Sequence, residues 1–133
     1  MSQQQRNLVL ILARDLADKL ASAAFVVDAE GTLVYFNERC GELLGRSFAE
    51  VGPMPLESWA TGFSPTDLDG HALEPDDLPL VQAVRKRIPA HKPLRIVQPT
   101  GEARDIAVTA IPLYAHADEA VGALALFWEH RGE

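Results

Sequence analysis

The spacing of apolar residues changes along the chain, and each spacing predicts a different element. Residues 8–20 contain no Gly or Pro and carry five apolar side chains within an arc of about 120° on a helical wheel. These five are Leu8, Val9, Leu12, Leu16 and Leu20. The spacing predicts a helix, and because Leu10 and Ile11 fall outside the arc, the helix is apolar on more than one side.

The surplus of apolar residues leaves two interpretations of this helix. It packs only against its own domain, or it also contacts a second copy of the chain. Two apolar surfaces favour the second interpretation. The residues predicted at a dimer interface are Leu8, Ile11, Leu12, Leu16 and Leu20.

The pattern then becomes that of short strands. Residues 24–28 and 32–36 are rich in β-branched and aromatic side chains, and Gly31 between them permits a tight turn, which predicts a β-hairpin. Asn37 suits the N-cap of a helix over residues 38–44 that ends at Gly45. The following middle segment mixes Gly and Pro with large apolar side chains, which indicates short helical turns and loops.

One more helix and three strands complete the prediction. Acidic residues and Pro at 74–79, with basic residues at 85–87, match the two ends of a helix over about residues 77–87. Strands are predicted at 94–98, 104–113 and 121–128, and the last is apolar on both faces, which is typical of a central strand. Hairpins imply an antiparallel sheet with the helices crossing one face, so the fold class is α+β.

The composition fits one globular domain and excludes several functions. The chain has 133 residues, 47% hydrophobic and 23% charged, and its net charge of −7 argues against general nucleic-acid binding. A single cysteine excludes an internal disulfide. The longest apolar run is too short for a membrane span, and no signal-peptide pattern is present. We therefore expect a soluble, cytoplasmic protein.

Several segments, in their order and spacing, resemble PAS domains. They are residues 25–31, 34–37, 43–45, 73–80, 100–104, 110–113 and 121–123. The resemblance implies a five-stranded antiparallel sheet, helices that enclose a pocket on one face, and a sensory or protein-interaction role, often in a homodimer. It implies that the N-terminal helix packs on the other face and against the partner subunit. The expected parts are an N-terminal helix (1–22), a PAS domain (23–130) and a tail (131–133).

The resemblance also places the end of the last strand where family members connect to an effector helix. Trp128, Glu129 and His130 stand at this connection, with Glu129 as its acidic residue. Little sequence follows, so the expected effector, such as a histidine kinase or a transcription regulator, is a separate protein or a missing domain.

A PAS-like pocket would be lined by apolar side chains of the strands and the middle segment. The candidates are Phe25, Val27, Phe36, Trp59, Phe63, Val84, Ile106 and Leu126. A one-residue error in the facing of a strand would exchange its candidates for their neighbours. The alternative is a filled core that binds no ligand.

Flavin and haem are both disfavoured as cofactors. Light-oxygen-voltage (LOV) domains resemble this fold and carry a photoactive cysteine in an Asn-Cys-Arg-Phe-Leu motif, but Cys40 lies in a different context and is interpreted as a buried structural residue. In PAS domains that bind haem, a histidine of the long helix holds the iron, and residues 77–87 contain none.

Metal binding and catalysis have weak support. The four histidines, His71, His91, His116 and His130, show no metal-binding spacing. Residues 67–70 indicate a solvated turn rather than a calcium loop. No catalytic motif occurs, and Asp76 and Asp77 are interpreted as helix capping.

Three hypotheses of function follow. The first is a signalling PAS module that dimerises and passes the state of a ligand or partner to an effector. The second is a small-molecule enzyme, an isomerase or hydrolase, which needs a titratable group inside the pocket. The third is an interaction module with a filled core.

Overall fold

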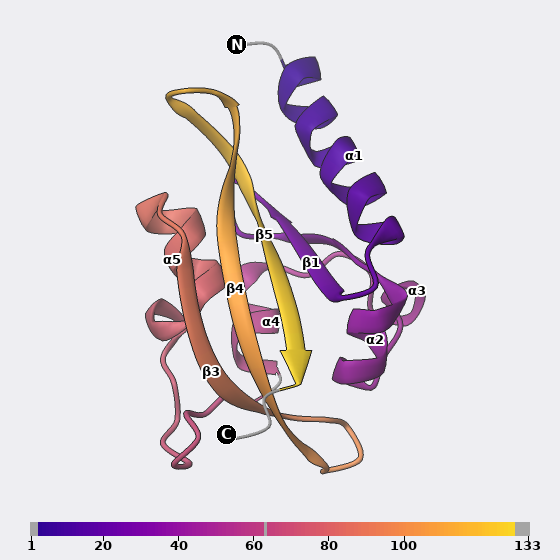
Figure 1. Cartoon of the computed structure of the whole chain (residues 1–133), viewed down its shortest axis with the longest axis vertical. Helices are drawn as coiled ribbons and strands as arrows, with labels where there is room; N and C mark the ends of the chain where they lie inside the picture. The colour runs from indigo at the N-terminus through magenta and orange to yellow at the C-terminus, as the bar shows by residue number, and fades with distance from the viewer. Residues whose placement is uncertain (1–2, 63, 130–133) are drawn as a thin grey trace.

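The computed structural model describes residues 3–62 and 64–129, which form one five-stranded antiparallel sheet with its helices (Figure 1). The strand order is β2-β1-β5-β4-β3, so the last strand is central, as its two apolar faces predicted. The strands are β1 (Ala23–Asp28), β2 (Leu33–Phe36), β3 (Ala90–Val97), β4 (Ala103–His116) and β5 (Glu119–Glu129). The predicted α+β class is confirmed.

Helices cover both faces of the sheet. We call the face that carries the larger hydrophobic cluster, with α2, α4 and α5, the inner face, and the face on which α1 packs the outer face. The helices are α1 (Gln3–Lys19), α2 (Glu38–Leu44), α3 (Phe48–Val51), α4 (Leu56–Gly62), the short 3₁₀ helix η1 (Pro75–Asp77) and α5 (Pro79–Lys86). No described helix is long and apolar enough to cross a membrane.

The two ends of α2 lie where the sequence predicts them. The Asn37 side chain accepts a hydrogen bond from the Cys40 N–H, and Gly45 ends the helix with a left-handed φ of 78°. Gly31 closes the β1–β2 turn at a φ of 86°. A Cβ at Gly31 would lie 2.5 Å from the Leu56 side chain, so the turn needs glycine for space as well as for conformation.

Several elements, such as α1 and β4, extend beyond their predicted bounds, and two others differ in ways that a proline explains. β3 starts at Ala90 and contains Pro93, which is tolerated because β3 is an edge strand and does not need every N–H for pairing. The helix predicted over residues 77–87 is divided, because Pro79 lacks an N–H and starts the new helix α5. Along β4, Ile106, Val108 and Ala110 all face the inner cluster, as alternation predicts.

Candidate functional site

An apolar cavity of about 70 Å³ lies in the inner core. Its walls come from β1, β3, β4 and β5 on the sheet side and from α2, α4 and the start of α5 on the other side. The side chains of Phe25, Trp59, Leu78, Ile106 and Val108 are among those that line it, and each is less than a tenth exposed. The cavity is therefore built from side chains that the core itself holds in place.

The cavity presents almost no polar group. No charged side chain is among the described residues that line it. The Trp59 ring N–H, its one side-chain donor, is directed at the Gly31 carbonyl oxygen at 2.7 Å. The resulting environment offers neither a proton-transfer group nor a charged anchor for a ligand.

The cavity does not fit a flavin or a haem. Sites for ligands of that size have volumes of about 300–1,000 Å³, and this one measures about 70 Å³. Cys40 is fully buried but is not among the lining residues. Burial raises the pKa of its thiol, which keeps it protonated and unreactive.

A strap of residues 64–74 follows α4 and contributes Pro65 to the cavity wall. Next along the strap, Thr66 pairs with Arg95 of β3 through two backbone hydrogen bonds of 2.9 and 2.8 Å. Arg95 is itself held by Asp105, with 2.6 Å between Nε and Oδ1, and this hydrogen bond raises the pKa of the guanidinium. The strap is thereby attached to the edge of the sheet.

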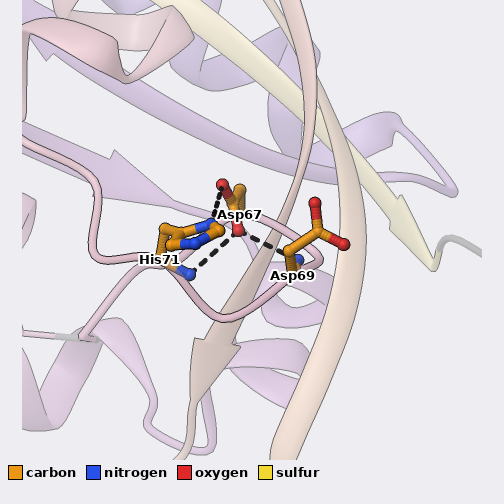
Figure 2. Close-up of side chains that lie close together, drawn as sticks. All are labelled: Asp67, Asp69 and His71. Atoms are coloured by element: carbon orange, nitrogen blue, oxygen red, sulfur yellow. Dashed lines mark hydrogen bonds and ion pairs between the residues drawn. The ribbon is translucent and has the colours of Figure 1, made fainter.

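The strap also carries a cluster of metal-ligand type, Asp67, Asp69 and His71 (Figure 2). One side-chain ligand atom from each lies within 4.8 Å of the others, although the spacing of the histidines predicted no such cluster. Asp67 Oδ1 accepts hydrogen bonds of 2.9 Å from the N–H groups of Asp69 and His71, and Oδ2 lies 3.1 Å from His71 Nδ1. The bond from the His71 N–H is the main cause that lowers the pKa of Asp67.

These contacts explain the cluster as a turn. The Asp67 carboxylate is already used to close the chain on itself, as aspartate does in Asx turns. Asp69 and His71 are exposed, as expected for the solvated turn predicted at residues 67–70. We therefore assign the cluster to the attachment of the strap.

The structure brings together only part of the predicted pocket. Phe25, Trp59 and Ile106 line the cavity. Three others belong to the inner core or pack against it without lining the cavity: Val27, Phe36 and Val84. Phe63 lies outside the described residues.

The predicted position of Leu126 at the pocket is corrected, because this residue lies on the outer face and packs with the α1 cluster. Both faces of β5 are apolar, so its sequence carries no alternation from which the facing of Leu126 can be derived. The contribution of Pro65 to the wall was also missed, since a proline in an irregular segment gives no signal beyond a break in regular structure.

On the outer face, α1 approaches the sheet through small side chains. Ala13 and Ala17 are buried against Ala24, Val26 and Leu124. Of the predicted interface residues, Leu8, Ile11, Leu12 and Leu16 are 53%, 60%, 58% and 51% exposed. Leu20 differs, because it is half-buried against its own sheet.

Two polar side chains attach α1 to the sheet. The buried amide of Asn37 donates to the carbonyl oxygens of Ala17 and Ser22 at 2.8 and 2.9 Å, and its oxygen accepts from the N–H groups of Ala24 and Cys40. One side chain thus ties the end of α1 to β1 and α2. The sequence predicted the cap of α2 but not the bonds to the end of α1.

The second attachment is Tyr35 of β2. Its hydroxyl donates to the Asp18 carboxylate, and the Arg14 guanidinium lies over its ring, 4.5 Å from the centroid. Burial and, after it, the hydrogen bond to Asp18 raise the pKa of Tyr35 to about 12. Both partners of Tyr35 lie on α1, so the side chain fixes the rotation of the helix on the sheet.

Comparison with known proteins gives matches only at the level of structure. No protein-family model matches the chain, and no curated protein matches its sequence. Among solved structures, the PAS domain of a protein from Colwellia psychrerythraea is 19% identical, with a TM-score of 0.64 over 94% of this chain and 99% of that chain. The LOV protein of Rhodobacter sphaeroides is 17% identical, with a TM-score of 0.69 over 100% and 70%.

A third similar structure is a PAS domain from a two-component sensor histidine kinase. It is 15% identical, with a TM-score of 0.59 over 93% of this chain and 98% of that chain. All three likenesses extend over nearly the whole of this chain, and at such identities they establish a shared fold.

Proposed function

We propose that this chain, whose fold is that of PAS domains, is a sensory module that forms a homodimer through α1 and passes the state of its inner cavity to an effector. The observation that carries the proposal is the division of α1 into two apolar sides. Ala13 and Ala17 are buried against the sheet, whereas Leu12 and Leu16 remain more than half exposed. Exposed aliphatic side chains gathered on one helix mark an interaction surface.

A second copy of the chain is the partner that suits this surface. Leu8, Leu12 and Leu16 follow one another at intervals of four residues, which form a ridge on the helix. A ridge of this kind packs against an identical ridge across a two-fold axis, because the same patch then serves both subunits. Of the four charged side chains that follow Leu12 on α1, Arg14 and Asp18 are engaged with Tyr35, and Asp15 and Lys19 pair with each other at 2.6 Å, so each has a partner within the chain.

The input is proposed to be a small ligand of the cavity, and the output an effector such as a histidine kinase. The second point draws on the structural likeness to a PAS domain from a two-component sensor histidine kinase. The enzyme hypothesis requires a titratable group in the cavity, and the described lining residues provide none. The non-catalytic, sensory role is therefore the better supported one.

Sedimentation velocity tests the dimer. We expect the wild type to sediment as a dimer and a Leu12→Asp, Leu16→Asp variant to sediment as a monomer, because two carboxylates on the ridge weaken association about a hundredfold or more. The variant should keep its circular dichroism spectrum, since both side chains are exposed.

The matched control is Ile88→Asp, which places the same charge on an apolar residue, 48% exposed, beyond the end of α5. We expect this variant to remain a dimer. Monomers in all three samples, or dimers in all three, would refute association through α1.

A further inference from the structure

We propose that the inner cavity binds a small, uncharged and wholly apolar ligand, such as an apolar gas or a short hydrocarbon. The inference rests on the proposed function only in treating this ligand as the input of the sensor. Its three supports are the chemistry of the walls, the volume, and the prolines that restrict the backbone of two wall segments.

The chemistry of the walls selects against polar ligands. Leu78, Ile106 and Val108 present only hydrocarbon, and the ring nitrogen of Trp59 is already paired with Gly31. A ligand with a carboxylate, ammonium or hydroxyl group would lose its water without gaining a partner, and burial of such a group is strongly unfavourable. A ligand without polar atoms loses nothing of this kind and gains by leaving water.

The volume limits the ligand to a few non-hydrogen atoms. An engineered apolar cavity of about 150 Å³ in another protein stays dry and binds benzene or xenon. The present cavity, at about 70 Å³, is roughly half as large. Xenon and short hydrocarbons are therefore the class that matches both its volume and its chemistry.

Two wall segments have a restricted backbone. Pro65 and Pro79, whose rings restrict the backbone, both contribute to the lining. Pro65 belongs to the strap that Thr66 attaches to β3, and Pro79 starts α5. Protein interiors contain few voids larger than a water molecule, and one larger side chain on β4 would fill this one. The unfilled apolar space is therefore available to a ligand.

Methyl-resolved NMR of the full chain, titrated with xenon under pressure, tests the proposal. We expect saturable shifts for the methyl groups of Leu78, Ile106 and Val108, and none for Val26 and Leu124 on the outer face. Acetate, a charged probe of similar size, should shift none of the five. Xenon shifts that do not saturate, or that are equal on both faces, would overturn the proposal, as would equal shifts with acetate.

A cavity-filling variant sharpens the test. Val108→Ile adds one methyl group on the inner face, and we expect it to weaken xenon binding about threefold or more. The control Leu124→Met conserves volume on the outer face and should leave the affinity unchanged. Unchanged affinity in Val108→Ile would place the binding elsewhere, and if that variant fails to fold, the wild-type methyl map still decides. A monomer by sedimentation would refute the dimer without affecting this result.

Discussion

The inner and outer faces of the sheet bury their residues by different means. On the inner face, large aromatic side chains interlock: the ring of Phe25 lies 5.4 Å from that of Trp59 and 6.0 Å from those of Phe36 and Phe127. On the outer face, α1 contributes two buried alanines to the contact. Dispersion and hydrophobic burial dominate the first layer, whereas hydrogen bonds from Asn37 and Tyr35 complete the second.

The difference suggests separate tasks for the two layers. An interlocked aromatic layer keeps the shape of a cavity, because any shift must displace several large rings together. A layer with few apolar contacts, held by a small number of directional bonds, opens at a lower free energy. We therefore expect α1 to shift its position more readily than the inner layer does when a ligand or a partner binds.

Truncation of an inner aromatic side chain should have the largest effect. Phe36 is almost fully buried and contacts the rings of Phe25 and Phe48. We expect Phe36→Ala to lower the free energy of unfolding by about 3–5 kcal/mol in urea denaturation. The control Ile111→Ala, on the outer face and 40% exposed, should cost about 1 kcal/mol or less. Equal losses in the two variants would remove the contrast between the faces.

Removal of the Asn37 amide should have the next largest effect. Asn37→Ala leaves two N–H groups and two carbonyl oxygens without their partner, and we expect a loss of about 2–3 kcal/mol. The control Ser47→Ala removes the exposed cap of α3, for which about 1 kcal/mol or less is expected. If Asn37→Ala costs no more than this control, the amide acts only as a helix cap.

The sequence predicts much of this fold because the signals are local. Asn37 and Gly45 bound α2 at the predicted residues, and alternation places Ile106 and Val108 on one face of β4. The bounds of α2 follow from its capping residues and the facing of β4 from its periodicity, and both signals lie within short segments of the sequence.

The candidate site is less predictable, because it depends on which segments meet in space. Leu126 lies in a strand that is apolar on both faces, so its facing is fixed only by the register with β1 and β4. The Asp67–His71 contact arises from the geometry of one turn, and the Tyr35–Asp18 contact joins residues of different elements. The spacing of residues along the sequence predicts neither of these two contacts.

Loss of the Tyr35 hydroxyl should have the smallest effect, with a pH dependence that identifies it. At pH 8 we expect Tyr35→Phe to be less stable than the wild type by only about 1 kcal/mol or less, since the lost bond to Asp18 is exposed to solvent. The pKa of Tyr35 rises on folding from 10.0 to about 12, so the folded state favours the protonated phenol. Its contribution is complete below pH 10 and is lost as the pH rises to about 12.

The measurement for Tyr35 is urea denaturation of both proteins at several pH values. The difference in stability should narrow between pH 10 and 12, because the variant has no phenol to ionise. A difference that stays constant over this range would show that the pKa of Tyr35 does not rise on folding.

Native-state hydrogen exchange of the wild type, at a concentration where it is monomeric, tests the division between the two layers most directly. We predict that amides of α1 exchange through a local opening at least about 2 kcal/mol lower in free energy than that of β1 and β5. The α1 opening should depend little on added urea, whereas the central strands should exchange only on global unfolding. Exchange of α1 and β5 at the same free energy, with the same urea dependence, would contradict the account.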